Sequence, residues 1–375
     1  MNILILSKDY PPTIGGVETY SYHVAEGLSK NHDVTVVSFQ GKHYINSWKD
    51  TANVIRINSL LNNELFKAVS LLLNLLIILS SKKYDLIYAT TWKVSVPFAL
   101  LNILFKIKFL IVCHGAEITR HKHKRPIMKM MKWVLNKADS IFTVSTFTRD
   151  KVIEYSKVSP DKIHVIPNGV DFSKLVPLDK NESRNKLGFA KDQFVFLTVS
   201  RVDSRKGHDI VIKAIKSLIV KKFNVLYVIV GDGPSINSLK ELTENWGLQE
   251  QVKFAGFVSN EELDEYYSAS DVFVMLNTMK DDRDFEGFGL VFAEAGYYGL
   301  PLIGGNNAGP KEVIIDSISG YLVNDVIEEL AEKLSLLYSD RNHSKKLGEE
   351  AKKISQKEFS LKKLIERIEL KIQTL

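Results

Sequence analysis

The sequence is poor in the features that define several protein classes. It has one cysteine, Cys113, in 375 residues, which excludes an internal disulfide and a cysteine-based zinc site and fits a reducing compartment. The longest apolar stretches, residues 65–79 and 98–112, are interrupted by lysine and asparagine. Both fall short of the roughly 18–20 apolar residues that span a bilayer, so we interpret each as a buried helix or strand.

Targeting and common nucleotide-binding signatures are missing as well. The first apolar run ends at Lys8, too early for a signal peptide, and we expect a cytoplasmic protein. Neither the Gly-x-Gly-x-x-Gly dinucleotide motif nor the Walker A phosphate loop occurs. Charged residues make up 25% and hydrophobic residues 45% of the chain, as in ordinary globular proteins, and the length favours two domains.

Positive charge is concentrated in the first half of a chain whose net charge is +6. The segment from Arg120 to Lys137 holds seven Lys and Arg residues, two His and no acid, with apolar residues between them. Such a segment suits an anionic membrane surface, with its apolar face in the headgroup zone. The alternative is a half-buried helix with a solvated basic face. Because no nucleic-acid motif accompanies the charge, we expect no nucleic-acid partner.

Alternating strand and helix patterns predict parallel sheets that are covered by helices on both faces. Predicted strands in the first half are residues 2–7, 32–39, 84–89, 109–113, 140–144 and 163–166. The pattern restarts with strands at residues 194–200, 224–231, 252–258, 271–276 and 301–305. We therefore predict an α/β protein of two doubly wound domains, 1–170 and 171–358, with a cleft between them. Ligands of such sheets bind at the carboxyl ends of the strands, so the loops there are the candidate sites.

Two of these loops suit phosphate groups. Gly15 and Gly16 directly precede a predicted helix, so backbone N–H groups at its N-terminus can approach an anion. Arg201 and Lys206 lie in the loop after the strand at 194–200, and such a pair of cations suits a diphosphate. The alternatives are a plain strand-to-helix turn for the glycines and a solvated basic turn for the two cations.

Two further loops carry groups that suit a sugar. Glu286 is predicted in a loop, where its carboxylate can accept hydrogen bonds from sugar hydroxyls, and Glu294, in the following helix, can bind a ribose diol. Glu294 could instead complement the helix dipole, and a carboxylate pair also occurs in glycoside hydrolases. His114 follows a strand and would point into the cleft, or it is a hydrogen-bonded core histidine.

An Asp-x-Asp pattern, Asp282-Arg283-Asp284, precedes Glu286. Such a pair of carboxylates can bind a divalent metal. Here it lies in an acidic loop, and we interpret it as support for Glu286 and expect no metal ion.

Taken together, six segments in order resemble the group 1 (family 4) glycosyltransferases of the GT-B fold. They are the loop at 9–18, the His-Gly segment at 113–117, the passage at 166–171, the basic loop at 200–209, the pair 230–234 with 256–258, and the Glu-x7-Glu segment at 286–295. The resemblance implies two Rossmann-like domains facing each other across a deep cleft. The first would bind the acceptor and the second the nucleotide-sugar donor, and a final helix, about 359–375, would pack back onto the first domain.

The resemblance also implies roles for single residues. Gly15 and Gly16 would contact the donor pyrophosphate, which Arg201 and Lys206 would neutralise. Glu286 would hold the hydroxyls of the transferred sugar, Glu294 the ribose, and His114 would stabilise the transition state. Backbone amides would assist from Phe288, Gly289, Leu290 and Val291, and the base would lie near Phe257 and Val258.

The implied reaction retains the anomeric configuration and needs no protein nucleophile, no metal and no cofactor beyond the nucleotide sugar. The loops resemble those of bacterial mannosyltransferases that use GDP-mannose and a lipid acceptor, although UDP-sugar enzymes carry similar loops. The expected acceptor is a lipid-linked glycan or glycolipid of cell-surface polysaccharide synthesis at the inner face of the membrane, with candidate contacts from Tyr10, Thr91, Trp92 and Arg120. Alternatives are a soluble acceptor, a non-catalytic polyanion- or membrane-binding module, and a related epimerase or phosphorylase.

Overall fold

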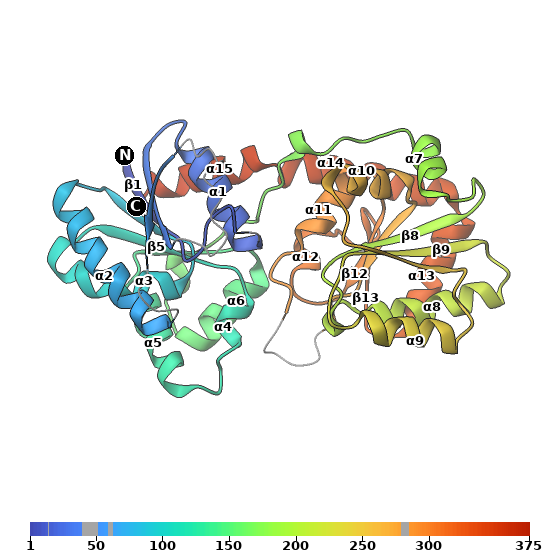
Figure 1. Cartoon of the computed structure of the whole chain (residues 1–375), viewed down its shortest axis with the longest axis horizontal. Coiled ribbons are helices and arrows are strands. Elements are labelled where there is room, and N and C mark those ends of the chain that lie inside the picture. Colours follow the sequence, from blue (N-terminus) through green and yellow to red (C-terminus); the bar gives the residue numbers. More distant parts are fainter. Residues whose placement is uncertain (14, 40–51, 59–62, 279–284) are drawn as a thin grey trace. The chain divides into compact units, whose positions relative to one another are not determined.

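The computed structural model describes residues 1–13, 15–39, 52–58, 63–278 and 285–375. These residues form two units (Figure 1). The first unit comprises Met1–Asn168 and Leu361–Leu375, and the second comprises Gly169–Ser360. The chain therefore leaves the first unit, builds the second and returns, so that the last helix belongs with the N-terminal part.

The first unit contains a seven-stranded parallel sheet with the order β3-β2-β1-β4-β5-β6-β7. The strands are β1 (Asn2–Leu6), β2 (Asp33–Phe39), β3 (Asn53–Ile57), β4 (Leu86–Ala89), β5 (Lys108–Cys113), β6 (Ser140–Thr143) and β7 (Ile163–Val165). Nearly all side chains of the central strands are buried, since helices cover both faces of the sheet.

Alternate strand residues face two separate apolar clusters in this unit. One cluster joins the sheet to α2 (Glu64–Ser81), α3 (Trp92–Phe105), α4 (Ala116–Thr119), α5 (Arg125–Lys137) and α6 (Thr146–Ser156). The other joins it to α1 (Gly16–Leu28) and α15 (Leu361–Ile372). Leu364, Ile368 and Ile372 of α15 are buried there, and α15 packs on α1 at Gly27 and Ile365.

The buried elements that the sequence predicts for residues 65–79 and 98–112 are confirmed for β5 but only in part for α2 and α3. Helix α2 does bury Leu71, Leu75, Ile78 and Leu79 in the core, but its opposite side is exposed. The end of α3 is exposed as well. By length and apolar composition α2 also passes as a membrane-spanning helix, the single one in the parts of the chain that the structure describes. The prediction of buried elements therefore holds for only one side of α2, because a helix that is apolar all round gives no sign of which side meets the sheet.

The second unit repeats this architecture, so the α/β fold class is confirmed for both. Its six-stranded parallel sheet has the order β10-β9-β8-β11-β12-β13. The strands are β8 (Phe194–Val199), β9 (Val225–Val230), β10 (Val252–Gly256), β11 (Val272–Met275), β12 (Leu302–Gly305) and β13 (Gly320–Val323). One face packs against α8 (His208–Val220), α9 (Ile236–Asn245) and α13 (Ile327–Ser339). Helices α10 (Asn260–Ala269) and α11 (Leu290–Tyr297) meet the other face through aromatic contacts to Phe273 of β11. The remaining helices of this unit are α7 (Lys180–Leu187), α12 (Pro310–Val313) and α14 (Arg341–Glu358).

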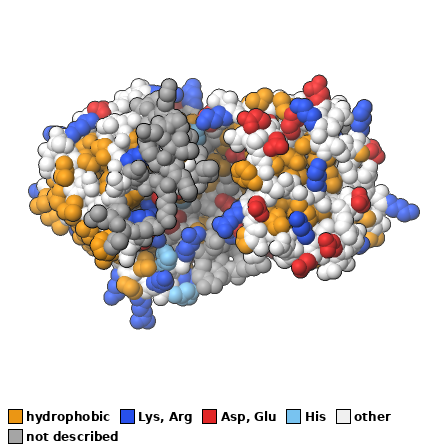
Figure 2. Space-filling model, in the orientation of Figure 1, with side chains coloured by type: hydrophobic (Ala, Val, Ile, Leu, Met, Phe, Trp, Pro, Cys, Tyr) orange, Lys and Arg blue, Asp and Glu red, His pale blue; other side chains and the backbone are white. Residues whose placement is uncertain are grey.

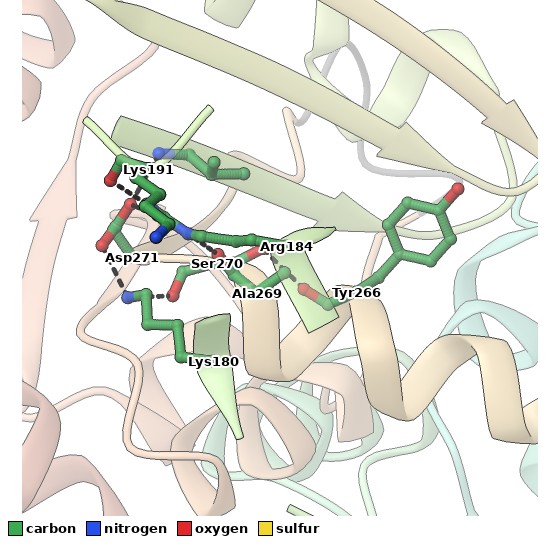
Figure 3. A network of polar contacts seen from close by, with 8 residues as sticks. Lys180, Arg184, Lys191, Tyr266, Ala269, Ser270 and Asp271 are labelled. Atoms are coloured by element: carbon green, nitrogen blue, oxygen red, sulfur yellow. Dashed lines mark hydrogen bonds and ion pairs between the residues drawn. The ribbon is translucent and has the colours of Figure 1, made fainter. Parts of the chain in front are cut away.

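A polar network fastens α7 to the amino-terminal ends of β8 and β11 (Figure 3). The guanidinium of Arg184, which is 5% exposed, donates to the Asp271 carboxylate at 2.6 Å and to the Ala269 carbonyl at 3.0 Å. The same carboxylate accepts from Lys180 at 2.6 Å and from the Val195 N–H at 2.7 Å. Because the network lies at the end of the sheet opposite the candidate loops, we assign it to the stability of the unit.

Candidate active site

In the second unit, the basic loop after β8 turns one lysine inward. The short 3₁₀ helix Ser204–Lys206 is capped by Asp203, whose side chain accepts from the Arg205 N–H at 3.1 Å. Gly207 follows in the left-handed region, at φ +72°, and a Cβ there would lie 2.9 Å from Leu276. Only glycine fits this turn without strain, and the turn directs Lys206 below the protein surface.

Lys206 and Glu286 form the central contact of the candidate site. Lys206 Nζ donates to Glu286 Oε2 at 2.5 Å, and the two side chains are only 9% and 20% exposed. Arg205 Nη1 approaches the same oxygen at 3.4 Å. The contact joins residues that are 80 positions apart in the chain. A carboxylate and two cations thus lie together, half-buried, at the carboxyl end of the sheet.

The charge state of Glu286 follows from these neighbours. Burial alone would raise the pKa of its carboxyl, but the charges and hydrogen bonds of Lys206 and Arg205 outweigh burial and hold the pKa below its ordinary value. The carboxylate is therefore ionised at neutral pH and accepts hydrogen bonds. Such a group can bind hydroxyls, while the cations beside it can bind an anion.

The start of α11 adds backbone donors next to Glu286. Gly289 caps the helix at φ +87°, so the N–H groups of Leu290 and Val291 lie in the first turn and have no acceptor within the helix. Two contacts fix the loop at residues 286–289. The Glu286 carbonyl accepts a hydrogen bond from the Gly309 N–H at 3.0 Å, and the buried Phe288 ring packs edge-on against Phe359. These donors and the helix dipole favour an anion at this end of α11.

Glu294 lies in α11 in a different environment. The Tyr267 hydroxyl donates to its Oε2 at 3.1 Å, and the buried Tyr267 ring stacks on Tyr298. Burial raises the pKa of the Glu294 carboxyl above its ordinary value, and the hydrogen bond from Tyr267 opposes this only in part. The two glutamates of the motif therefore have pKa values shifted in opposite directions, which indicates different tasks.

Other predicted donor residues of this unit are more exposed. Arg201 is exposed at the end of β8, and Phe257, after β10, is 87% exposed, while Val258 is half-buried. In the described part of the chain, the cations shown in contact with Glu286 are Arg205 and Lys206. Arg205 is absent from the sequence-based candidates, although its position directly before Lys206 is a signal that points to it.

Three hydrogen-bonded side chains beside the basic loop, Ser200, His208 and Tyr227, were likewise not among the candidates predicted from the sequence. His208 contacts the Ser200 hydroxyl at 3.2 Å and the Tyr227 hydroxyl at 3.0 Å, and its side chain is buried. Burial, with a smaller effect of the Lys206 charge, lowers the pKa of His208 to about 3. The ring is neutral at physiological pH and supports the first turn of α8 from inside.

The first unit holds His114 in one orientation. Its Nε2 lies 2.9 Å from the Thr90 carbonyl, which can only accept, so Nε2 carries the proton. Burial lowers the pKa of His114, and the ring is neutral with a lone pair on Nδ1. The Glu117 carboxylate accepts from the His114 backbone N–H at 2.5 Å, and Tyr20 meets the ring edge-on at 4.9 Å. The histidine is thus both hydrogen-bonded and half-buried at the carboxyl end of β5.

The glycine loop of this unit lies at the start of α1. Gly15 is extended and directly precedes the helix, and Gly16 is exposed, with open space where a Cβ would be. A Cβ on Gly15 would lie 2.1 Å from Glu18 Oε2, so the Glu18 carboxylate lies beside the helix N-terminus. An incoming phosphate at this place would meet that carboxylate.

The four candidate acceptor residues separate into two pairs. Tyr10 and Trp92 are core residues, 1% and 0% exposed, and the Trp92 indole donates to the Glu117 carbonyl at 3.2 Å. Thr91 is half-buried just before α3, and Arg120 is exposed after α4. Only the second pair presents side chains to solvent.

The Asp282-Arg283-Asp284 segment lies outside the described residues. Among the residues that are described, no group of three or more His, Cys, Asp or Glu side chains is arranged to hold a metal ion.

Comparisons with known proteins cover almost the whole chain. Residues 179–354 match the family model described as Glycosyl transferases group 1, and residues 14–174 match the one described as Glycosyltransferase Family 4. A GDP-mannose-dependent alpha-(1-6)-phosphatidylinositol monomannoside mannosyltransferase of Mycolicibacterium smegmatis is 25% identical over 359 residues, 92% of this chain and 91% of that one. A UDP-Gal:alpha-D-GlcNAc-diphosphoundecaprenol alpha-1,3-galactosyltransferase of Escherichia coli is 27% identical over 334 residues, 84% and 83% of the two chains. The crystal structure of Anabaena Alr3699/HepE in complex with UDP superimposes with a TM-score of 0.85 at 22% identity and covers 100% of both chains.

Proposed function

The chain belongs to the group 1, family 4 glycosyltransferases of the GT-B fold, and on that premise we propose that it moves a hexosyl unit from a nucleotide-diphosphate sugar to a lipid-linked glycan or glycolipid. The observation that carries the proposal is the contact between Lys206 and Glu286 beside the start of α11. In this proposal Lys206 is the cation for the diphosphate and the neighbouring Glu286 is the carboxylate for the sugar.

Each group has a separate task in this proposal. Lys206 and Arg205, with Arg201 at the loop entrance and the amides of Leu290 and Val291, stabilise the negative charge that develops on the departing diphosphate. Glu286 orients the transferred sugar through its hydroxyls. Side chains and amides do this electrostatic work, so the reaction proceeds without a metal ion.

The remaining donor and acid–base groups complete the proposed site. Glu294 binds the ribose diol, and the exposed Phe257 and neighbouring Val258 flank the base. His114, whose Nε2–H donates to the Thr90 carbonyl, has a neutral ring and stabilises the transition state. No carboxylate is assigned as a nucleophile, and the anomeric configuration is retained.

For the donor we favour GDP-mannose, which is named for the mycobacterial relative, over the UDP-galactose named for the Escherichia coli relative and the UDP bound in the Anabaena structure. Both named relatives act on acceptors with a lipid part, which supports a lipid acceptor here. Thr91 and Arg120 are the acceptor-side candidates that are open to solvent. The protein would work at the inner face of the cytoplasmic membrane.

The proposal is tested with radiolabelled GDP-mannose, UDP-galactose or UDP-glucose and vesicles that contain phosphatidylinositol or an undecaprenyl-diphosphate-linked sugar. We expect label from one donor to enter the lipid phase, with or without EDTA. Glu286→Ala should abolish transfer and keep the circular dichroism spectrum, whereas Glu265→Ala, which breaks a surface ion pair to Lys186, should retain transfer. Full activity of Glu286→Ala, or no donor consumed by the wild type, would refute the proposal.

A further inference from the structure

Helices α2 and α3 of the first unit expose an unusual amount of apolar surface. Eight large apolar side chains on these two helices are between 45% and 73% exposed. They are Leu65, Phe66, Val69, Leu73 and Ile77 of α2 and Leu100, Ile103 and Leu104 of α3. Figure 2 shows hydrophobic side chains gathered at the left of the view, over the region of α2 and α3. We call these eight residues the α2–α3 face.

The α2–α3 face continues into a basic region. Helix α3 packs between α2 and α5. A groove of about 510 Å³ opens beside the end of α3, and its lining includes Ile103, Lys106, Trp133 and Lys137. The groove therefore connects the apolar end of α3 with α5, whose exposed side carries Lys129 and Lys132.

The charge around the face is mostly positive, although Asp139 also lines the groove. Residues 64–137 contain thirteen Lys and Arg residues and three Asp and Glu residues. All three acids are engaged within the protein: Glu64 pairs with Lys8, Asp85 accepts from the Asn2 N–H, and Glu117 accepts from the His114 N–H. A partner that meets the apolar face also meets a surplus of cations, so it must present apolar groups beside negative charge.

The structure corrects how the basic segment itself can act. Met131, Val134 and Leu135 of α5 are buried in the core, so this helix cannot place its own apolar side in a headgroup zone. Its outward side carries Lys129 and Lys132, with Met130, which is 40% exposed, between them. Apolar insertion, if it occurs in this unit, has to come from the neighbouring helices.

We propose that the α2–α3 face docks on an anionic lipid bilayer, with its apolar side chains in the interfacial zone and the lysines of α5 against the lipid phosphates. The proposal deepens the proposed function, on which it rests, because it would hold the enzyme where a lipid acceptor resides. Helices α2 and α3 supply the apolar side chains that become buried in the bilayer, and α5 supplies the positive charge. Stable attachment needs both contributions, since either one alone binds weakly.

Vesicle co-sedimentation without nucleotide or acceptor tests the proposal apart from the enzyme reaction. The probes are phosphatidylcholine vesicles with and without phosphatidylglycerol. We expect wild-type protein to bind the anionic vesicles, and Ile77→Ser/Ile103→Ser/Leu104→Ser to bind at least about tenfold more weakly. Lys129→Gln/Lys132→Gln should weaken binding by about tenfold or more and reduce its salt dependence.

The matched control removes equally exposed apolar groups elsewhere: Val220→Ser/Ile318→Ser/Leu370→Ser should bind as the wild type does. Nucleotide binding by every variant checks that the donor half is intact. The proposal would be overturned if the wild-type protein did not bind anionic vesicles, or if the triple α2–α3 variant bound them as the wild type does. It would also be overturned by light scattering that shows a wild-type dimer and a monomeric α2–α3 variant, because a second copy would then cover the face.

Discussion

Changing Lys206 should weaken nucleotide binding, whereas changing Glu286 should not. In the structure each neutralises the other across 2.5 Å, so a phosphate that arrives at Lys206 competes with the Glu286 carboxylate. Lys206→Met removes the cation and keeps a side chain of similar length. Glu286→Gln removes the competing charge and keeps the shape.

The expected magnitudes follow from the contact that each change removes. A hydrogen bond to a charged group contributes about 1.5–3 kcal/mol, so Lys206→Met should raise the Kd for the nucleoside diphosphate about ten- to hundredfold. Glu286→Gln should leave that Kd unchanged or lower it, while sugar transfer falls by about a hundredfold or more, because the sugar loses its charged acceptor. Each variant should also lose about 1–3 kcal/mol of unfolding free energy through the unpaired partner.

Isothermal titration calorimetry with UDP and GDP measures the affinities, and urea unfolding measures the stability. Lys186→Met is the matched control, because it breaks a 2.6 Å lysine–glutamate pair on the surface, and it should leave nucleotide affinity unchanged. Equal weakening of nucleotide binding by Lys206→Met and Glu286→Gln would refute the division of tasks, and so would unchanged binding by Lys206→Met.

Three further outcomes are expected. The pKa of His208 is about 3 in the fold and near 6.5 in the unfolded chain, so at acidic pH the unfolded state binds the extra proton. The unfolding free energy therefore decreases as the pH is lowered through 6.5, by about 2 kcal/mol at pH 5. His208→Gln should remove that part of the loss in urea titrations at pH 7 and pH 5, and an unchanged pH dependence would contradict it. Tyr267→Phe removes the hydroxyl that donates a hydrogen bond to Glu294, which should raise the pKa of that carboxyl further. We expect the KM for the nucleotide sugar to rise about tenfold with kcat retained, and steady-state kinetics with an unaltered KM would argue against this role. Gly27→Leu should lower the unfolding free energy by about 1–3 kcal/mol, because an added Cβ alone would lie 2.4 Å from Ile365 of α15. An unchanged urea midpoint would show that α1 and α15 can move apart without loss of stability.

Most of the fold was predictable because buried parallel strands are short apolar runs between helical patterns. The predicted strand at 194–200 is β8 (Phe194–Val199), and the one at 109–113 is β5 (Lys108–Cys113). Strands β3 and β13, which lie at the edges of their sheets, were not predicted. Both are short, and the half-buried residues of β3 mix polar with apolar side chains, so no apolar run marks the strand.

The sequence indicates candidate site residues but not the contacts between them. The motif spacing points to Lys206 and Glu286 separately, yet their contact depends on how the Gly207 turn directs the lysine inward. The same turn brings Arg205 to the carboxylate. Similarly, composition shows that α2 is apolar, but only packing against the sheet decides that Leu71 is buried and Ile77 is exposed.

The central claim is that the second unit binds a nucleoside diphosphate through Lys206 and the start of α11 without a metal. A thermal-shift screen of UDP, GDP and ADP, each with and without EDTA, tests it most directly. A nucleotide at 100 times its Kd stabilises the fold by about 2.7 kcal/mol, so one nucleotide should raise the melting temperature by several degrees in wild-type protein, regardless of EDTA, and by about half as much or less in Lys206→Met. No shift with any nucleotide, or a shift that EDTA abolishes, would contradict the account.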